Sequence, residues 1–125
     1  MKKTIEISTL GKTWLFDIDG TIVKHNGYKT DGYDTFLPGA EEFLKAIPTA
    51  DEIIFLTSRN MEYKEMTENF FRLHGIRYSE IIYGLPHGER ILVNDRKPSG
   101  LPVSHAVNPN RDEFMDVNFQ MNSNL

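Results

Sequence analysis

The chain has 125 residues, of which 39% are hydrophobic, so it can build one ordinary core but not two. Its net charge is −4 and no stretch concentrates Lys and Arg, which argues against a nucleic-acid partner. It contains no cysteine, which excludes disulfides and thiolate chemistry, and no run of the roughly 20 apolar residues that a membrane span needs. We therefore expect a single cytoplasmic domain over residues 1–125, with no membrane contact.

Four short apolar runs predict β-strands, at residues 13–17, 52–57, 81–83 and 91–94. The second run is continuously apolar, as expected of a strand that is buried on both faces of a parallel sheet, and residues 91–93 have the same character. Residues 4–8 are a candidate hairpin partner of 13–17, and residues 104–107 a candidate edge strand.

Two helices are predicted between these strands. The first lies between Gly39 and Pro48, and its apolar face has the i, i+3, i+4, i+7 spacing of Ala40, Phe43, Leu44 and Ile47. The second has Asn60 as its candidate N-cap and Gly75 as its stop, with an apolar face of Tyr63, Met66, Phe70 and Leu73. Alternating strands and helices predict an α/β fold, a Rossmann-like three-layer sandwich with a mainly parallel sheet and no separate cap domain.

Two segments fall outside this pattern. Residues 24–37 are polar, with two glycines and several aromatic rings, and are predicted to form a long loop or a small flap. Loops of that length in compact domains are often functional. Residues 108–125 show no periodicity and are predicted to be a C-terminal tail of surface strand or coil.

The residues that indicate chemistry are Asp17 and Asp19, in the run Asp17-Ile18-Asp19-Gly20-Thr21 at the end of the first buried strand. Their spacing of two points both carboxylates to one side, where they repel each other unless a cation lies between them. Magnesium, a hard cation that prefers oxygen ligands, suits such a pair. A surface Asx turn is the alternative, but such a turn does not usually follow residues as apolar as Trp14-Leu15-Phe16.

Polar residues also follow two other predicted strands. Asp95 comes directly after residues 91–94, and we interpret it as a metal ligand, since the carboxyl ends of parallel strands meet at one edge; a cap or turn residue is the alternative. Thr57 ends the strand at 52–57, where its hydroxyl and the amides of the next helix start are suited to a phosphoryl oxygen. Simple helix capping by Ser58 or Asn60 is the competing interpretation.

Together these three strand ends resemble the haloacid dehalogenase superfamily of phosphohydrolases, in a small capless form. Residues 17–21 match the first motif of that superfamily, Thr57-Ser58-Arg59 the second, and Asn94-Asp95-Arg96 the fourth. The resemblance implies that Asp17 is a nucleophile that takes the phosphoryl group, and that Asp19 is the acid and base. It also implies Mg²⁺ held by the Asp17 carboxylate, the Asp19 main-chain carbonyl and Asp95.

The chain departs from the superfamily pattern at two places. Asn94 replaces the first acid of the fourth motif, and the third motif, a Lys or Arg just before the fourth strand, lacks a clear counterpart. Lys97 is the first candidate for the missing cation, with Arg59 as its rival. His87 and Arg90 are the other candidates. Only about seven residues separate 81–83 from 91–94, fewer than the dozen that a parallel crossover usually needs.

The predicted function is a magnesium-dependent phosphatase that acts on a small phosphorylated metabolite such as a sugar phosphate. The site residues are then Asp17 and Asp19 for catalysis, with Thr57, Arg59 and Lys97 for phosphate. The resemblance is compatible with a homo-oligomer, because capless members of the superfamily often borrow a cap from a neighbouring subunit. A phosphate-binding protein that has lost turnover is the alternative, and a receiver domain of two-component signalling is a third interpretation.

Overall fold

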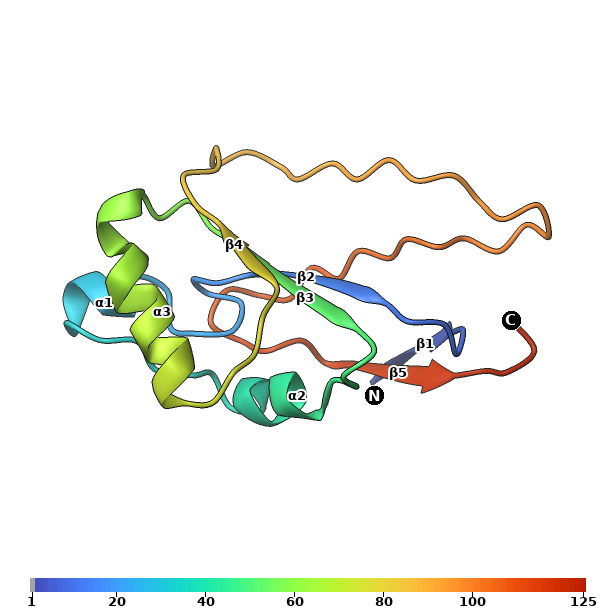
Figure 1. Ribbon diagram of the computed structural model, residues 1–125, viewed down its shortest axis with the longest axis horizontal. Coiled ribbons are helices and arrows are strands. Elements are labelled where there is room, and N and C mark those ends of the chain that lie inside the picture. Colours follow the sequence, from blue (N-terminus) through green and yellow to red (C-terminus); the bar gives the residue numbers. More distant parts are fainter. Residues whose placement is uncertain (1) are drawn as a thin grey trace.

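The computed structural model describes residues 2–125 and has an α/β architecture with parallel strands in two small open sheets. Strands β1 (Lys3–Ile7) and β5 (Val117–Met121) form one sheet, and β2 (Thr13–Asp17), β3 (Glu52–Leu56) and β4 (Glu80–Ile82) form the other (Figure 1). The helices are α1 (Gly27–Thr30), α2 (Ala40–Ala46) and α3 (Lys64–Leu73), preceded by the 3-10 turn η1 (Met61–Tyr63). In the described part of the chain, none of them is long and apolar enough to cross a bilayer.

The β2-β3-β4 sheet confirms the parallel arrangement of the first three predicted strands. Asp17 lies opposite Leu56 and Leu56 opposite Ile82, so all three strands end at the same edge. Asn60 caps η1 by accepting from the Glu62 amide, and α2 lies within a residue of its predicted bounds. The helix predicted between Asn60 and Gly75 begins as the 3-10 turn η1 and becomes α-helical only at Lys64. This edge of the sheet carries the Asp-x-Asp segment.

One face of this sheet holds the core. Phe16, Ile53 and Phe55 are buried on that face, and Leu44 of α2 and Phe71 of α3 are buried in the same cluster. The helix α3 is rotated relative to the prediction: Thr67 and Phe71 are its buried residues, whereas Leu73 is 85% exposed. The other face of the sheet carries the alternate residues of each strand, and these are only partly covered.

The hairpin prediction for residues 4–8 is wrong. β1 pairs in parallel with β5, with Ile5 opposite Phe119, and not with β2. The reason is aromatic packing: Phe119 meets the Trp14 ring edge-on at a centroid distance of 4.9 Å, which ties the small sheet to the start of β2. Part of the predicted tail at 108–125 is therefore a strand.

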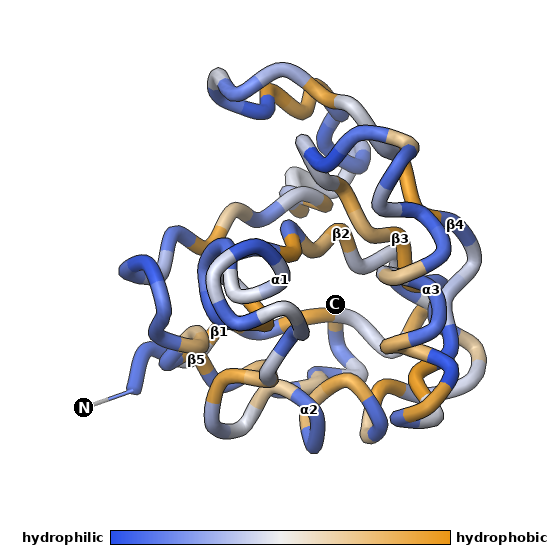
Figure 2. Tube along the Cα trace, turned by 90° about the vertical axis from the view of Figure 1, so that its left-hand side faces the viewer, coloured by the Kyte–Doolittle hydropathy of each residue, from blue (hydrophilic) through white to orange (hydrophobic). Residues whose placement is uncertain are grey.

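Residues 86–107, here called the arm, contradict the predicted strands at 91–94 and 104–107. No strand of the described chain lies between β4 and β5, and every residue from 86 to 100 is exposed. In Figure 1 the arm, in orange, leaves the end of β4, runs away from the helices, turns and comes back. Figure 2 shows it as a separate loop beyond β2 and β3, with hydrophobic stretches along it.

Candidate functional site

Asp17 is the last residue of β2, and the chain turns sharply after it. The main-chain carbonyl of Ile18 accepts hydrogen bonds from the amides of Thr21 and Ile22, and Gly20 takes a φ of +80° that favours glycine. The turn brings the Thr21 hydroxyl back to donate to Asp17 Oδ2 at 2.9 Å. The side chain of Asp17 is held in place at the sheet edge and remains 35% exposed.

Arg90 supplies a cation to this carboxylate. Its Nη1 lies 2.8 Å from Asp17 Oδ1, and both side chains are partly accessible to solvent. Arg90 comes from the start of the arm, directly before the apolar run Ile91-Leu92-Val93. Arg90 is therefore the basic residue that the structure places beside Asp17.

Asp19 is held by Arg59 in a bidentate ion pair. Arg59 Nε and Nη2 donate to the two Asp19 carboxylate oxygens at 3.0 and 2.9 Å. The same guanidinium donates to both oxygens of Asp34, at 3.0 and 2.7 Å, and to the Thr67 hydroxyl at 2.9 Å. All five N–H groups of Arg59 are thus used within the chain. Phosphate binding by Arg59 would require one of these bonds to break.

The guanidinium also lies against an aromatic face. The Arg59 carbon Cζ is 3.9 Å from the ring centroid of Tyr28, and its side chain has no exposed surface. Burial alone lowers the pKa of Arg59, but the hydrogen bonds and charges of Asp19 and Asp34 outweigh burial and raise the pKa above its ordinary value. Arg59 therefore stays charged and fixes the position of Asp19.

Asp34 and Tyr28 both come from residues 24–37, the segment predicted as a loop or flap. This segment contains α1, and both side chains are buried. Its contacts with Arg59 attach it to the sheet edge, so it forms a wall of the site rather than a free loop. The Asp34–Arg59–Asp19 chain of ion pairs connects that wall to the predicted acid and base.

Thr57 follows β3 and is 1% exposed. Its hydroxyl accepts a hydrogen bond from the Arg59 amide at 3.0 Å. This bond stabilises the turn from which the Arg59 side chain extends to Asp19 and Asp34. The Thr57 main-chain carbonyl accepts from the Leu85 amide at 3.0 Å, which anchors the base of the arm. Thr57 lies at the expected strand end, one residue after the Leu56 that is paired with Asp17. Binding of phosphate by the Thr57 hydroxyl stays a prediction.

Asp95 and Lys97 lie on the arm and are exposed. Lys97 begins the turn of the arm, where its amide donates to the Leu101 carbonyl at 3.0 Å. Residues 2–125 contain no group of three or more His, Cys, Asp or Glu side chains arranged to hold a metal ion. Asp17 and Asp19 lie at the end of β2 and Asp95 lies on the arm, so metal binding by these three residues stays a prediction.

The segment 110–113 lies against the Asp-x-Asp turn. The Asp112 amide donates to the Gly20 carbonyl at 2.8 Å, and the Asp112 carboxylate accepts from the His25 amide at 2.6 Å. A Cβ at Gly20 would come within 3.1 Å of the Arg111 side chain. Residues 110–113 therefore stabilise the turn that carries Asp19 by hydrogen bonds.

Sequence reasoning missed Asp34, Tyr28 and Asp112 as residues of this site, because no motif or strand end marks them. The sequence offers Arg90 as one of four candidate cations, with Lys97 as the first of them. The place of Arg90 directly before the fourth apolar run, where the resembled superfamily has its third-motif base, is the signal that favours it.

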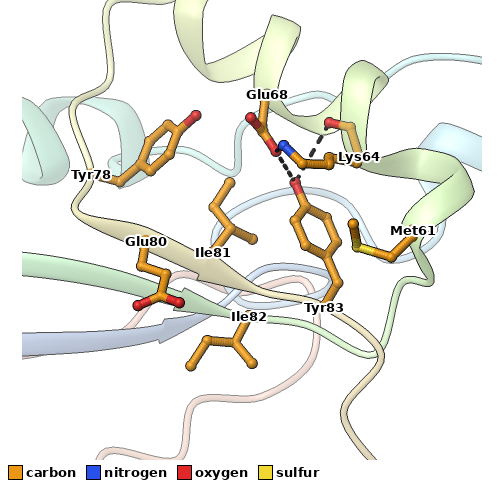
Figure 3. A pocket seen from close by; sticks show the side chains of 8 residues that line it. All are labelled: Met61, Lys64, Glu68, Tyr78, Glu80, Ile81, Ile82 and Tyr83. Atoms are coloured by element: carbon orange, nitrogen blue, oxygen red, sulfur yellow. Dashed lines mark hydrogen bonds and ion pairs between the residues drawn. The ribbon is translucent and has the colours of Figure 1, made fainter.

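A surface pocket lies elsewhere, between α3 and β4, and is lined by eight residues including Lys64, Glu68 and Tyr83 (Figure 3). The Tyr83 hydroxyl donates to Glu68 Oε2 at 2.9 Å across it. None of the predicted catalytic residues contributes to its walls. The pocket therefore plays no part in the site around Asp17.

Comparison with known proteins adds a likeness of fold. No protein-family profile and no curated protein sequence matches the chain. A chain in a solved structure of the Pnkp1/Rnl/Hen1 complex is similar, with a TM-score of 0.51 and 26% sequence identity over 68% of this chain. The matched part is 32% of that chain, so the present chain spans about a third of its length.

Proposed function

We propose that the chain is a phosphohydrolase in which Asp17 takes a phosphoryl group from a small phosphorylated metabolite, such as a sugar phosphate. The observation that carries the proposal is the arrangement at the end of β2. Asp17 faces the Arg90 guanidinium at 2.8 Å, while Asp19, two residues on, is fixed by a fully buried arginine. An accessible carboxylate beside a cation, with a second acid held nearby, suits transfer of an anionic group.

The proposed reaction has two steps. An Asp17 carboxylate oxygen attacks phosphorus, and the bond from phosphorus to the ester oxygen breaks. Asp19 gives a proton to the leaving alcohol, which requires one of its two hydrogen bonds from Arg59 to open so that this carboxyl group can carry the proton. A water molecule then attacks phosphorus, Asp19 takes up a proton from it, and the bond to Asp17 breaks to release inorganic phosphate. Arg90 shifts from Asp17 to the phosphoryl oxygens as the substrate enters, because both contacts need the same N–H groups.

Magnesium belongs to the proposal as its cofactor. The Asp17 carboxylate and the Asp19 carbonyl are oxygen ligands of the kind it prefers, and Asp95 is the third ligand of the set. When bound, the ion neutralises the negative charge of the phosphoryl oxygens. The proposal also includes a Rossmann-like three-layer architecture, in which the second face of the β2-β3-β4 sheet is covered. A cytoplasmic location stays a prediction from the cysteine-free sequence.

The test is phosphate release from para-nitrophenyl phosphate and from a panel of sugar phosphates and nucleotides, with added magnesium. Asp17→Asn should lower the rate by on the order of a thousand-fold while the fold is kept. Asp116→Asn is the matched control, since Asp116 is an exposed acid whose one ion pair, with Lys2, is 4.0 Å long. If Asp17→Asn keeps more than about a tenth of the activity, Asp17 is not the nucleophile.

A second candidate is a protein that binds phosphate or sugar phosphate without turnover. It is favoured by the exposed position of Asp95 and by the complete use of the Arg59 donors within the chain. Calorimetric binding of a sugar phosphate to the wild-type protein, with no release of inorganic phosphate under any metal, would support this candidate over the enzyme.

A further inference from the structure

The arm carries an apolar strand sequence that nothing covers. Ile91 is 86% exposed, Leu92 59% and Val93 89%. A continuous apolar run of this kind is typical of a strand in the middle of a parallel sheet. Left in water, it is also the type of segment that pairs with any open sheet edge it meets.

The same chain leaves a matching edge open. Among residues 2–125, β2 has β3 on one side in the order β2-β3-β4 and no strand on the other. The uncovered face of the sheet is apolar too: Leu15 is 47% exposed and Ile82 37%, and Ile54 is only partly buried. The arm therefore offers an unpaired apolar strand sequence, and β2 offers an unpaired strand edge beside an apolar face.

The arm does not reach the β2 edge of its own chain in parallel. Arg90 is bound to Asp17 at the carboxyl end of β2, so residue 91 starts at the end where a parallel strand would have to finish. Figure 1 shows the outgoing half of the arm running in the direction opposite to β2. Returning to the amino end of β2 would take a crossover of about a dozen residues, and only 83–90 are available.

A two-fold axis removes this obstacle. When the axis is perpendicular to the strands, β2 of the second copy runs opposite to β2 of the first. The outgoing arm, which is antiparallel to its own β2, is then parallel to that of the second copy. Such isologous exchange of one element between identical chains is a common route to dimers.

We propose that two copies of this chain exchange arms, so that residues 91–95 of each copy add a parallel strand to the open edge of β2 in the other. Residues 91–95 match β2 in length, and pairing their ends sets Leu15 opposite Val93 and Asp17 opposite Asp95. Val93 then covers the exposed Leu15, while Leu92 turns to the core face beside Trp14.

Arm exchange also changes the site around Asp17. This part of the inference rests on the proposed function. Asp95 of the second copy joins Asp17 and Asp19 of the first at the carboxyl end of β2, because Asp95 is paired opposite Asp17. Lys97 of the second copy follows two residues later and comes within reach of the same edge. Arg90 stays with its own chain, so each site is built from both copies.

The test uses cysteine pairs, because the chain has no cysteine of its own. Leu15→Cys and Val93→Cys are made as separate proteins with different tags, expressed together and oxidised. Residues opposite each other on neighbouring parallel strands have Cα atoms within the range that a disulfide bridges, about 4.4–6.8 Å. We expect a covalent dimer that contains both tags, and twice the 14.4 kDa chain mass by light scattering for the wild type.

The matched control replaces Val93→Cys with Leu73→Cys, which is equally exposed at 85% but lies at the end of α3. It should give no covalent dimer with Leu15→Cys. A second variant, Val93→Asp, should shift the protein to the mass of one chain. A wild-type monomer with no mixed disulfide overturns the exchange, as does a disulfide that forms only within a chain carrying both cysteines.

These readouts separate the two proposals. A cross-linked dimer that releases no phosphate from any substrate leaves the exchange standing and overturns the proposed function. A monomer that hydrolyses phosphate esters with magnesium supports the proposed function and overturns the exchange.

Discussion

Arg90 donates to Asp17 across 73 residues of chain, with 2.8 Å between Nη1 and Oδ1. The bond links the beginning of the arm to the end of the first buried strand of the sheet. Both side chains are about a third exposed, so an incoming anion competes directly for the guanidinium. In the proposed reaction, this ion pair is therefore the place where the phosphoryl group meets a positive charge of the protein.

The first prediction concerns Arg90. Arg90→Ala should lower kcat/KM by about a hundred-fold, because it removes the cation that stabilises the phosphoryl oxygens. Arg90→Lys should restore part of this loss, since it returns the charge without the fork of donors. Steady-state kinetics with a sugar phosphate or para-nitrophenyl phosphate checks it. His87→Ala, three residues earlier on the same exposed segment, is the control and should leave kcat/KM unchanged.

The second prediction concerns the buried ion pairs. Asp34→Asn should reduce the free energy of unfolding by about 2 kcal/mol, because charge-assisted hydrogen bonds to Arg59 are lost. Arg59→Met should cost more, about 3–5 kcal/mol, since it leaves the Asp34 carboxylate buried without a partner. Urea unfolding followed by fluorescence of Trp14, the single tryptophan, measures both.

The exposed ion pair between Lys24 and Asp31 provides the control. Lys24→Met should leave the urea midpoint unchanged, because exposed pairs contribute little. Equal losses in Asp34→Asn and Lys24→Met would show that burial of the Asp34–Arg59 pair has no effect on stability.

Much of the fold follows from local patterns in the sequence. The run at 13–17, the continuous apolar run at 52–57 and the capping residue Asn60 give parallel strands and helices close to their predicted bounds. The sequence also predicts Asp17 and Asp19 at the sheet edge, because strand ends and glycine turns are local features. These features depend on neighbours within a few residues.

Other parts of the site depend on contacts that no local pattern records. Asp34 is one polar residue among many in 24–37, and only the folded chain sets it against Arg59. The apolar run 91–93 predicts a buried strand, yet in the described chain it has no partner, since burial depends on what lies beside it and not on the run itself.

The third prediction concerns the metal. Hydrolysis should stop in excess chelator, return with magnesium and be inhibited by calcium added to the magnesium enzyme. Calcium takes more ligands at longer distances, so it occupies oxygen sites while misplacing the nucleophile. Full activity in excess chelator would rule out the magnesium site.

The fourth prediction is a pH dependence. Burial raises the pKa of Tyr83 above its usual value, and so does its hydrogen bond to Glu68. A tyrosine whose folded pKa is raised contributes stability that is present below its unfolded pKa of 10.0 and lost as pH rises beyond it. Wild-type stability should therefore fall more steeply above pH 10 than that of Tyr83→Phe.

Urea midpoints measured on both sides of pH 10 test this, with Tyr33→Phe as the control, since Tyr33 is 63% exposed. A wild-type curve that runs parallel to that of Tyr83→Phe throughout would contradict the role of the hydrogen bond.

The pairing of β1 with β5 joins the first strand of the described residues to the last of them, with Ile5 opposite Phe119. During synthesis β1 emerges long before its partner exists, and the Asp112 brace on Gly20 also has to wait. Such contacts between distant residues slow folding, because a large loop must close before they form. The β2-β3-β4 sheet can therefore assemble before residues 83–125 are made, whereas the turn that carries Asp19 is stabilised by Asp112 only once residue 112 has been made.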